Sequence, residues 1–114
     1  MIRRGEVYWV NLDPAVGAEI RKRRPALVVS NDISNLHSLT VTVAPLTSAG
    51  TDRAYPFQVK LPPGTCGHKE TTKVKVEQIR TVDKTRLVGQ SLGSLSEDLM
   101  LKVDAALRLH LALT

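Results

Sequence analysis

The sequence has few of the residues that small proteins use to bind metals or to cross-link the chain. Its one cysteine, Cys66, excludes an internal disulfide bond and a zinc site built from cysteines. Its three histidines, His37, His68 and His110, do not have metal-ligand spacing, and no acidic cluster is of the kind that holds magnesium. A glycine-rich phosphate loop and a nucleophile elbow are also missing. We therefore expect no metal and no cofactor.

Long apolar runs are missing as well. No segment approaches 18 consecutive apolar residues, so we expect no membrane-spanning helix. The charged residues near the N-terminus are not followed by the apolar stretch of a secretory signal. The expected location is therefore the cytoplasm, without membrane association.

The chain has 114 residues, of which 42% are hydrophobic and 24% are charged, as in a single globular domain spanning 1–114. Sixteen basic residues face 11 acidic ones, and 16 − 11 gives a net charge of +5. This excess favours a polyanionic partner such as nucleic acid, although ordinary proteins carry similar charge about as often. The basic run Arg21–Arg24 needs a second argument before it defines a site.

Most of the sequence has the composition and alternation of β-strands. Pro25–Ser30 is almost continuously apolar, which is typical of a strand covered on both faces. The turn-forming residues that follow it leave room for one short helix. The expected strands are Glu6–Leu12, Pro25–Ser30, Thr40–Leu46, Tyr55–Leu61, Thr71–Val82 and a short Leu87–Leu92. This pattern predicts a mainly β fold, a small, strongly curved, barrel-like sheet of five to seven strands.

The C-terminus is the one segment with a clear helical pattern. Ser96 is a favourable N-cap, and Glu97 and Asp98 follow in the first turn, where the helix dipole favours anions. Leu95 and Met100 have the spacing of a hydrophobic staple. An apolar stripe, which we expect to pack on the sheet, repeats every four residues at Leu99, Val103, Leu107 and Leu111.

An arginine and a threonine at strand ends are the residues best placed for chemistry. Arg24 precedes Pro25 and is therefore biased towards an extended backbone, at the end of the loop Pro14–Arg23. Thr47 ends the next expected strand, where its hydroxyl could face the same opening. Spacing alone favours structural roles, with the arginine in a salt bridge and the threonine in a turn.

The histidines and the cysteine have simpler interpretations. His37 and His68 lie in turn-like surroundings, so a catalytic pair is the less favoured alternative. His110 lies beside the helical stripe, where packing at the boundary of the core is the expected role. Cys66 lies between prolines and glycines and is expected to be a turn residue.

Segments spread along almost the whole chain resemble the MazF/PemK toxin family. Their order and spacing together carry the resemblance more than any single segment does. The segments are Arg4–Pro14, Val16–Glu19, Arg24–Asp32, Val43–Thr47, Tyr55–Val59, Glu77–Asp83 and Lys102–Leu107.

The resemblance implies a growth-inhibiting endoribonuclease of a toxin–antitoxin pair. It implies an SH3-like barrel that acts as a homodimer and is inhibited by a MazE-like antitoxin with an acidic C-terminal segment. The implied reaction is metal-independent, sequence-specific cleavage of single-stranded RNA. The 2′-hydroxyl attacks the phosphate and leaves a 2′,3′-cyclic phosphate and a 5′-hydroxyl.

The resemblance also assigns residues. The catalytic arginine and threonine of the family fall on Arg24 and Thr47, and its loop glutamate falls on Glu19. Many members have serine before that glutamate, whereas this chain has Ala18 and so has no hydroxyl there. The remaining supporting or RNA-binding positions that we expect are Lys22, Arg23, Gln78 and Arg80.

Two other functions stay open at this point. One is a non-enzymatic toxin like the gyrase poison CcdB, which shares the barrel, and the other is an SH3-like nucleic-acid-binding module. Neither function needs the pair of Arg24 and Thr47.

Overall fold

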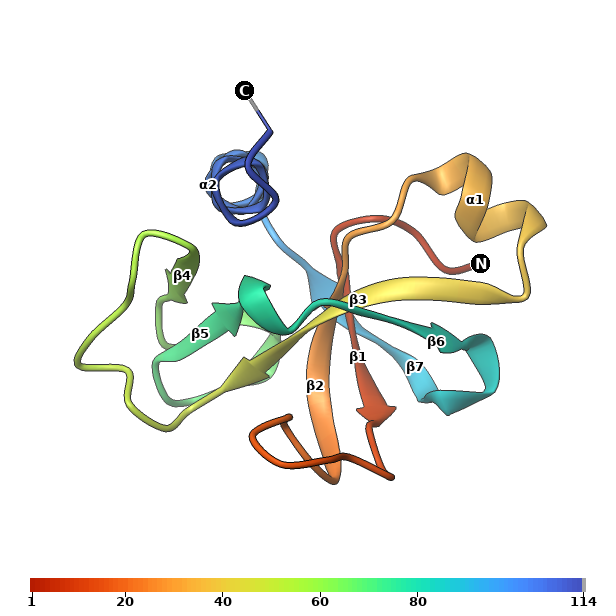
Figure 1. Ribbon diagram of the computed structural model, residues 1–114, viewed down its shortest axis with the longest axis horizontal. Helices are drawn as coiled ribbons and strands as arrows, with labels where there is room; N and C mark the ends of the chain where they lie inside the picture. The colour runs from red at the N-terminus through yellow and green to blue at the C-terminus, as the bar shows by residue number, and fades with distance from the viewer. Residues whose placement is uncertain (114) are drawn as a thin grey trace.

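The computed structural model describes residues 1–113 and shows a seven-stranded sheet with two α-helices (Figure 1). The elements are β1 (Glu6–Asn11), β2 (Arg23–Val28), α1 (Asp32–His37), β3 (Thr40–Thr47), β4 (Gln58–Leu61), β5 (Thr72–Lys75), β6 (Arg80–Asp83), β7 (Leu87–Ser94) and α2 (Glu97–His110). Short 3-10 helices lie at Thr65–Gly67, Val76–Gln78 and Lys84–Arg86. The mainly β fold, the number of strands and the C-terminal helix are as expected.

The strand β3 organises the sheet. Neighbouring strands run antiparallel in the order β4-β5-β3-β2-β1-β7, and β6 pairs with the first half of β3. In Figure 1, β3 is the long yellow strand that crosses the molecule. Within residues 1–113 the path ends at β4 and β7, so the sheet curves without closing completely.

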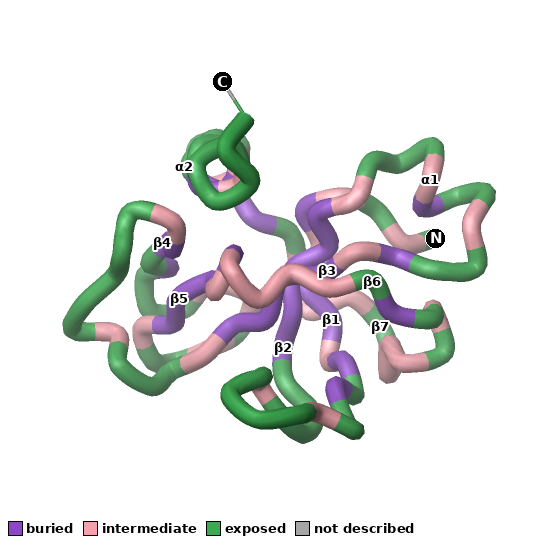
Figure 2. The backbone as a smooth tube through the Cα atoms, in the orientation of Figure 1, coloured by how far each residue is buried: buried purple, intermediate pink, exposed green. Residues whose placement is uncertain are grey.

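The core lies on both sides of the central strands, which appear as the purple segments of β1, β2 and β3 in Figure 2. In β1, Val7 faces one apolar cluster, whereas Tyr8 and Val10 face the other. In β2, Leu27 and Val28 divide between the same two clusters. Side chains of the first strand therefore alternate between the two clusters, and the expected two-sided burial of the second strand is confirmed.

The prediction of one strand over Thr71–Val82 is wrong. Val74 of β5 pairs with Leu46, and Arg80 of β6 pairs with Val43 of the same strand. The six-residue advance from Val74 to Arg80 therefore lies opposite an advance of only three residues along β3. The extra residues form the 3-10 helix Val76–Gln78.

Other boundaries also differ from the expected ones. Strand β4 begins only at Gln58, because the Gln58 amide donates to the carbonyl of Tyr55 and closes a turn there. Strand β2 lies two residues earlier than expected, at Arg23–Val28, and β7 extends to Ser94. The expected short helix is α1, capped by the side chain of Asn31.

Helix α2 packs against the core cluster that contains Val7, as its stripe predicts. The Ser96 hydroxyl caps it by accepting from the Leu99 amide at 3.3 Å. Val103 and Ala106 are buried, but Leu111 follows the end of the helix and is 48% exposed, so the predicted stripe ends one turn early. Within residues 1–113, neither helix is long and apolar enough to cross a membrane.

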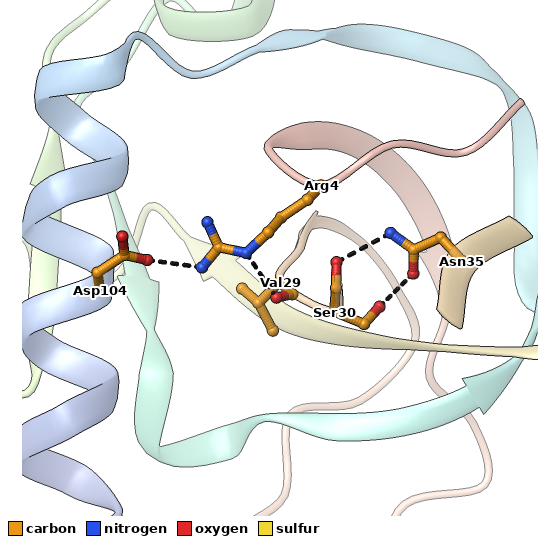
Figure 3. Close-up of polar contacts among 5 residues, drawn as sticks. All are labelled: Arg4, Val29, Ser30, Asn35 and Asp104. Atoms are coloured by element: carbon orange, nitrogen blue, oxygen red, sulfur yellow. Dashed lines mark hydrogen bonds and ion pairs between the residues drawn. The ribbon is translucent and has the colours of Figure 1, made fainter. Parts of the chain in front are cut away.

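A polar network ties the N-terminal segment to both helices (Figure 3). The Arg4 guanidinium donates from Nη2 to the Asp104 carboxylate of α2 at 2.6 Å and from Nε to the Val29 carbonyl at 2.9 Å. The buried amide of Asn35 in α1 exchanges hydrogen bonds with the hydroxyl and the carbonyl of Ser30. This network holds the turn after β2 in place.

Candidate active site

A cleft opens where β2 and β3 separate. The two strands pair as far as Ala26 with Pro45, and beyond this point β3 is paired only on its other edge, with β5 through Leu46 and Thr47. Extending the β2–β3 register by two residues places Arg24 opposite Thr47. The resulting hollow of about 230 Å³ is lined by Trp9, Arg23, Arg24, Pro25, Leu46, Thr47, Ser48, His68 and Thr72.

Arg24 is exposed at the mouth of this cleft. Its Nε donates to the carbonyl of Arg21 at 3.1 Å, which orients the guanidinium without neutralising it. Among the described residues it forms no ion pair, so the salt bridge favoured by spacing alone is wrong. The guanidinium keeps a full positive charge and free N–H donors for an anion.

Thr47 is half-buried on the opposite side of the cleft. Its Oγ1 accepts from the amide of Ala49 at 3.1 Å, so the expected turn contact is present. An accepted hydrogen bond fixes the hydroxyl oxygen but leaves its own hydrogen available. Thr47 can therefore donate to an oxygen bound in the cleft while it closes the turn.

An aromatic side chain forms part of the cleft wall. The Cζ atom of Arg23 lies 5.9 Å from the centroid of the Trp9 ring, within the range of a cation–π interaction. The ring of His68 lies 6.2 Å from Trp9 at an angle of 47°. Trp9 and Thr72 were not predicted as site residues from the sequence. The only sequence signal of an unusual backbone near His68 is the pair of glycines in the turn before it.

The other predicted residues do not line this cleft. Glu19, Gln78 and Arg80 line a second hollow, of about 360 Å³, which also contains Pro45. Lys22 is exposed on the loop between β1 and β2, with its backbone N–H bound to the Asp13 carboxylate at 2.9 Å. The predicted residues therefore divide between two adjoining parts of the surface.

The residues of the second hollow shape the loop between β1 and β2. Gln78 accepts from the amide of Ile20 at 2.7 Å and donates to the carbonyl of Ala18 at 3.3 Å. Glu19 accepts from the amide of Val16 at 2.6 Å, and Arg80 donates to the Leu12 carbonyl at 2.9 Å. These hydrogen bonds hold the loop that leads into the basic run in a defined conformation. The Arg24 side chain is hydrogen-bonded to the end of this loop.

The cysteine and the two remaining histidines lie apart from this chemistry. Cys66 is in the turn Thr65–Gly67, as expected, and burial raises the pKa of its thiol, which disfavours a thiolate nucleophile. His37 lies at the exposed end of α1, and His110 is exposed on α2 with its ring 6.4 Å from Phe57. In residues 1–113, no three histidine, cysteine or acidic side chains gather where they could hold a metal ion.

A curved antiparallel sheet with a C-terminal helix and a cationic cleft at split strand ends defines a small, mainly β protein with a site suited to an anionic ligand. Residues 3–111 match the family described as PemK-like, MazF-like toxin of type II toxin-antitoxin system. The chain belongs to this family, which confirms the resemblance of its sequence.

Curated relatives match over nearly the full length. Endoribonuclease MazF9 of Mycobacterium tuberculosis is 42% identical, over 99% of this chain and 98% of the relative. Endoribonuclease EndoA of Bacillus subtilis is 39% identical, over 99% and 97%. The expected enzyme class, an endoribonuclease, is the class that these relatives carry in their names, and it is confirmed at that level.

Solved structures have the same fold. An endoribonuclease in complex with its cognate antitoxin from a mycobacterial species superposes with a TM-score of 0.81 at 29% identity, covering 100% of this chain and 98% of the other. MazF from Deinococcus radiodurans also gives 0.81 at 29% identity, covering 97% and 96%.

Proposed function

We propose that this toxin inhibits growth in the cytoplasm by cutting single-stranded RNA at short specific sequences, without a metal ion. The observation that carries the proposal is the cleft between β2 and β3, which places Arg24 and Thr47 on facing strand ends. Attack of the ribose 2′-oxygen forms a bond to phosphorus and breaks the bond to the 5′-oxygen. The products are a 2′,3′-cyclic phosphate and a 5′-hydroxyl.

Arg24 would stabilise the charge that develops in this reaction. The two non-bridging phosphate oxygens gain negative charge in the transition state, and a guanidinium can donate two parallel hydrogen bonds to them. The contact to the Arg21 carbonyl holds the fork before the substrate arrives. One such preorganised donor contributes roughly 3–4 kcal/mol, or 10²–10³ in rate.

Thr47 would hold one phosphate oxygen or protonate the leaving 5′-oxygen. Its hydroxyl oxygen is already fixed by the Ala49 amide, so its proton points to the remaining directions. Arg23 and Lys22 add positive charge beside the cleft, which suits contacts to RNA phosphates. Glu19, Gln78 and Arg80 would act through the shape of the loop and through contacts to bases.

The first test is the substitution Arg24→Ala, with Arg108→Ala on the exposed face of α2 as the matched control. We expect cleavage of a long RNA to slow at least about 10²-fold in the first variant only. Arg24→Lys should also be slow, because lysine keeps the charge but loses the fork. Equal rates for wild type and Arg24→Ala would refute the assignment.

The nature of the nucleophile and the need for metal can be tested together. Replacing the ribose 5′ to the scissile bond by deoxyribose should abolish cleavage and preserve binding, since the attacking oxygen is gone. Excess EDTA should leave the rate on normal RNA unchanged. Cutting of the deoxy substrate would identify water as the nucleophile and refute the mechanism.

The antitoxin partner is expected to be acidic. The net charge of +5 and the exposed run Arg21–Arg24 suit an acidic, partly disordered segment that folds on binding. The solved complex of a similar endoribonuclease with its cognate antitoxin supports an antitoxin as the partner. A bound antitoxin should compete with RNA, and unimpaired cleavage in its presence would refute a shared groove.

We also propose a homodimer. Leu109, Leu111 and Leu113 are 56%, 48% and 59% exposed near the C-terminus, which leaves apolar surface uncovered. A stable interface should bury more than about 1,000 Å². Sedimentation that shows only the 12.5 kDa species at micromolar concentration would contradict this assembly.

The alternative of a gyrase poison is separable in one assay. A CcdB-like toxin would inhibit DNA supercoiling, and its toxicity would survive Arg24→Ala. We expect instead that this substitution removes toxicity and RNA cleavage together. A plain nucleic-acid-binding module would show neither activity.

A further inference from the structure

The cleavage reaction needs a group that moves protons, and the cleft offers one. The 2′-hydroxyl must lose its proton as it attacks. Arginine cannot accept it, because its pKa lies above about 12. Threonine hydroxyls are not basic at neutral pH. Of the residues that line the cleft, only His68 carries an imidazole, the side chain that ordinarily titrates near neutrality.

A strained turn holds His68 against the cleft wall. Gly64, Cys66 and Gly67 all have positive φ, at 91°, 49° and 78°. The His68 amide donates to the Thr65 carbonyl at 3.0 Å and its carbonyl accepts from the Gly64 amide at 2.6 Å, which closes the turn on both sides. The ring therefore reaches Trp9 from a backbone with little freedom.

Two buried polar atoms in this wall have no hydrogen-bond partner within residues 1–113. They are Nδ1 of His68 and Oγ1 of Thr72, a residue that is only 3% exposed. Leaving such a buried atom unpaired is costly, because it has given up its hydrogen bonds to water. Both residues also line the neighbouring hollow of about 320 Å³, so the ring lies between two open spaces. Unpaired polar atoms at such a place are typical of a site completed by its ligand.

We propose that His68 is a third catalytic residue of this toxin. Its neutral imidazole accepts the proton of the 2′-hydroxyl as the bond from that oxygen to phosphorus forms. The bond to the 5′-oxygen breaks, and that oxygen keeps the electron pair and takes up a proton from water, directly or through Thr47, which water then reprotonates. The imidazolium then returns its proton to water. This assignment rests on the proposed function, since it adds a base to that reaction.

The charged groups around the ring do not compete for this role. Arg23 and Arg24 face it from β2, and Lys69 and Glu70 follow it in its own loop. Arginine, lysine and glutamate side chains ordinarily titrate well away from neutrality. Thr72 and Ser48 are neutral neighbours. A fall in rate at acidic pH that disappears when His68 is replaced is therefore assignable to its imidazole.

The test compares His68→Gln with His37→Gln, which changes an exposed histidine at the end of α1. Single-turnover cleavage of one RNA is measured from pH 5 to 9, with melting temperatures as the control for folding. We expect His68→Gln to slow cleavage about 10²- to 10⁴-fold and to abolish the fall in rate at acidic pH. His37→Gln should behave as wild type. Binding of the deoxy substrate should change less than about threefold in both variants.

A second substrate separates base from acid. A 5′-bridging sulfur in place of the 5′-oxygen leaves without protonation, so it would rescue the loss of an acid but not of a base. We expect no rescue in His68→Gln. Rescue would overturn the assignment as base, and a wild-type rate in His68→Gln on RNA would overturn any catalytic role. Wild-type protein that cuts no RNA would refute the proposed function itself, a result distinct from either.

Discussion

Gln78 is expected to hold the loop between β1 and β2 in its closed conformation. Its side chain joins two backbone groups of that loop, the amide of Ile20 at 2.7 Å and the carbonyl of Ala18 at 3.3 Å. A hydrogen bond of this kind contributes about 0.5–1.5 kcal/mol net, and the longer one belongs at the low end. The substitution Gln78→Ala should therefore lower the free energy of opening the loop by about 1–2 kcal/mol. Such a change raises the open population about 5- to 30-fold.

Limited proteolysis measures this opening directly. Trypsin cleaves after arginine and lysine, and the loop carries Arg21, Lys22 and Arg23 in succession. The bond after Arg24 is protected because proline follows it. When opening and closing are faster than cleavage, the rate of cutting tracks the open population. We expect cutting in this run to become about 5- to 30-fold faster in Gln78→Ala.

A matched control and a clear refutation are available. Gln90 is exposed in β7 and its side chain makes no hydrogen bond within residues 1–113, so Gln90→Ala should be cut like wild type. The contacts of Lys22 to Asp13 and Leu12 stay in place in the variant, so the faster cutting should be confined to the bond after Arg21, next to the section that Gln78 holds. Equal trypsin rates for Gln78→Ala and Gln90→Ala would show that this glutamine does not hold the loop.

Three further substitutions test the surrounding structure. Arg4→Ala removes the hydrogen bonds to Asp104 and Val29 and should lower the free energy of unfolding, measured in urea, by about 1–2 kcal/mol. In an Asp104→Ala background the same substitution should cost much less. Thr72→Val replaces an unpaired buried hydroxyl by a methyl group and should raise the melting temperature by a few degrees; a lower value would contradict the unpaired state. The amide N–H of Arg4 lowers the pKa of Asp32, so this carboxylate stabilises the fold above its unfolded pKa of about 3.9, and that contribution is lost as the pH falls through the lower folded value. The stability advantage of wild type over Asp32→Asn should therefore be present at pH 6 and shrink as the pH falls below about 3.9, and an advantage that stays constant into the acidic range would refute it.

The sequence predicted strand faces and the helix better than it predicted strand ends. Apolar side chains alternate between the two faces around Val7 and form a continuous run around Leu27. Both patterns follow from burial, so they can be recognised in the local sequence. The break at Val76–Gln78 is not a property of the local sequence. It arises because β5 and β6 both pair with β3, and more residues separate them than the matching positions of β3 require. A run such as Thr71–Val82 alternates across this break and so reads as one strand.

The candidate site could also be predicted only in part, because some of its residues are marked by local sequence and others are brought together by the fold. Arg24 and Thr47 could be recognised because each lies at the end of an expected strand, within a segment that resembles the MazF/PemK family. Trp9 and His68 come together only through the fold, since 58 residues separate them and their rings lie 6.2 Å apart. No spacing rule along the chain connects a strand tryptophan to a histidine in a distant turn.

The separation of β2 from β3 beyond Pro45 creates the site. If β3 stayed paired with β2 beyond Pro45, backbone hydrogen bonds would close the gap between Arg24 and Thr47. Because the two strands separate there, each strand end is paired on its far edge alone, Thr47 with β5 and Arg24 with β1. The Arg24 guanidinium is exposed and oriented by the Arg21 carbonyl, and the Thr47 hydroxyl oxygen is fixed by the Ala49 amide. The cleft therefore has two hydrogen-bonded walls, which present a cation and a hydroxyl to an entering phosphate.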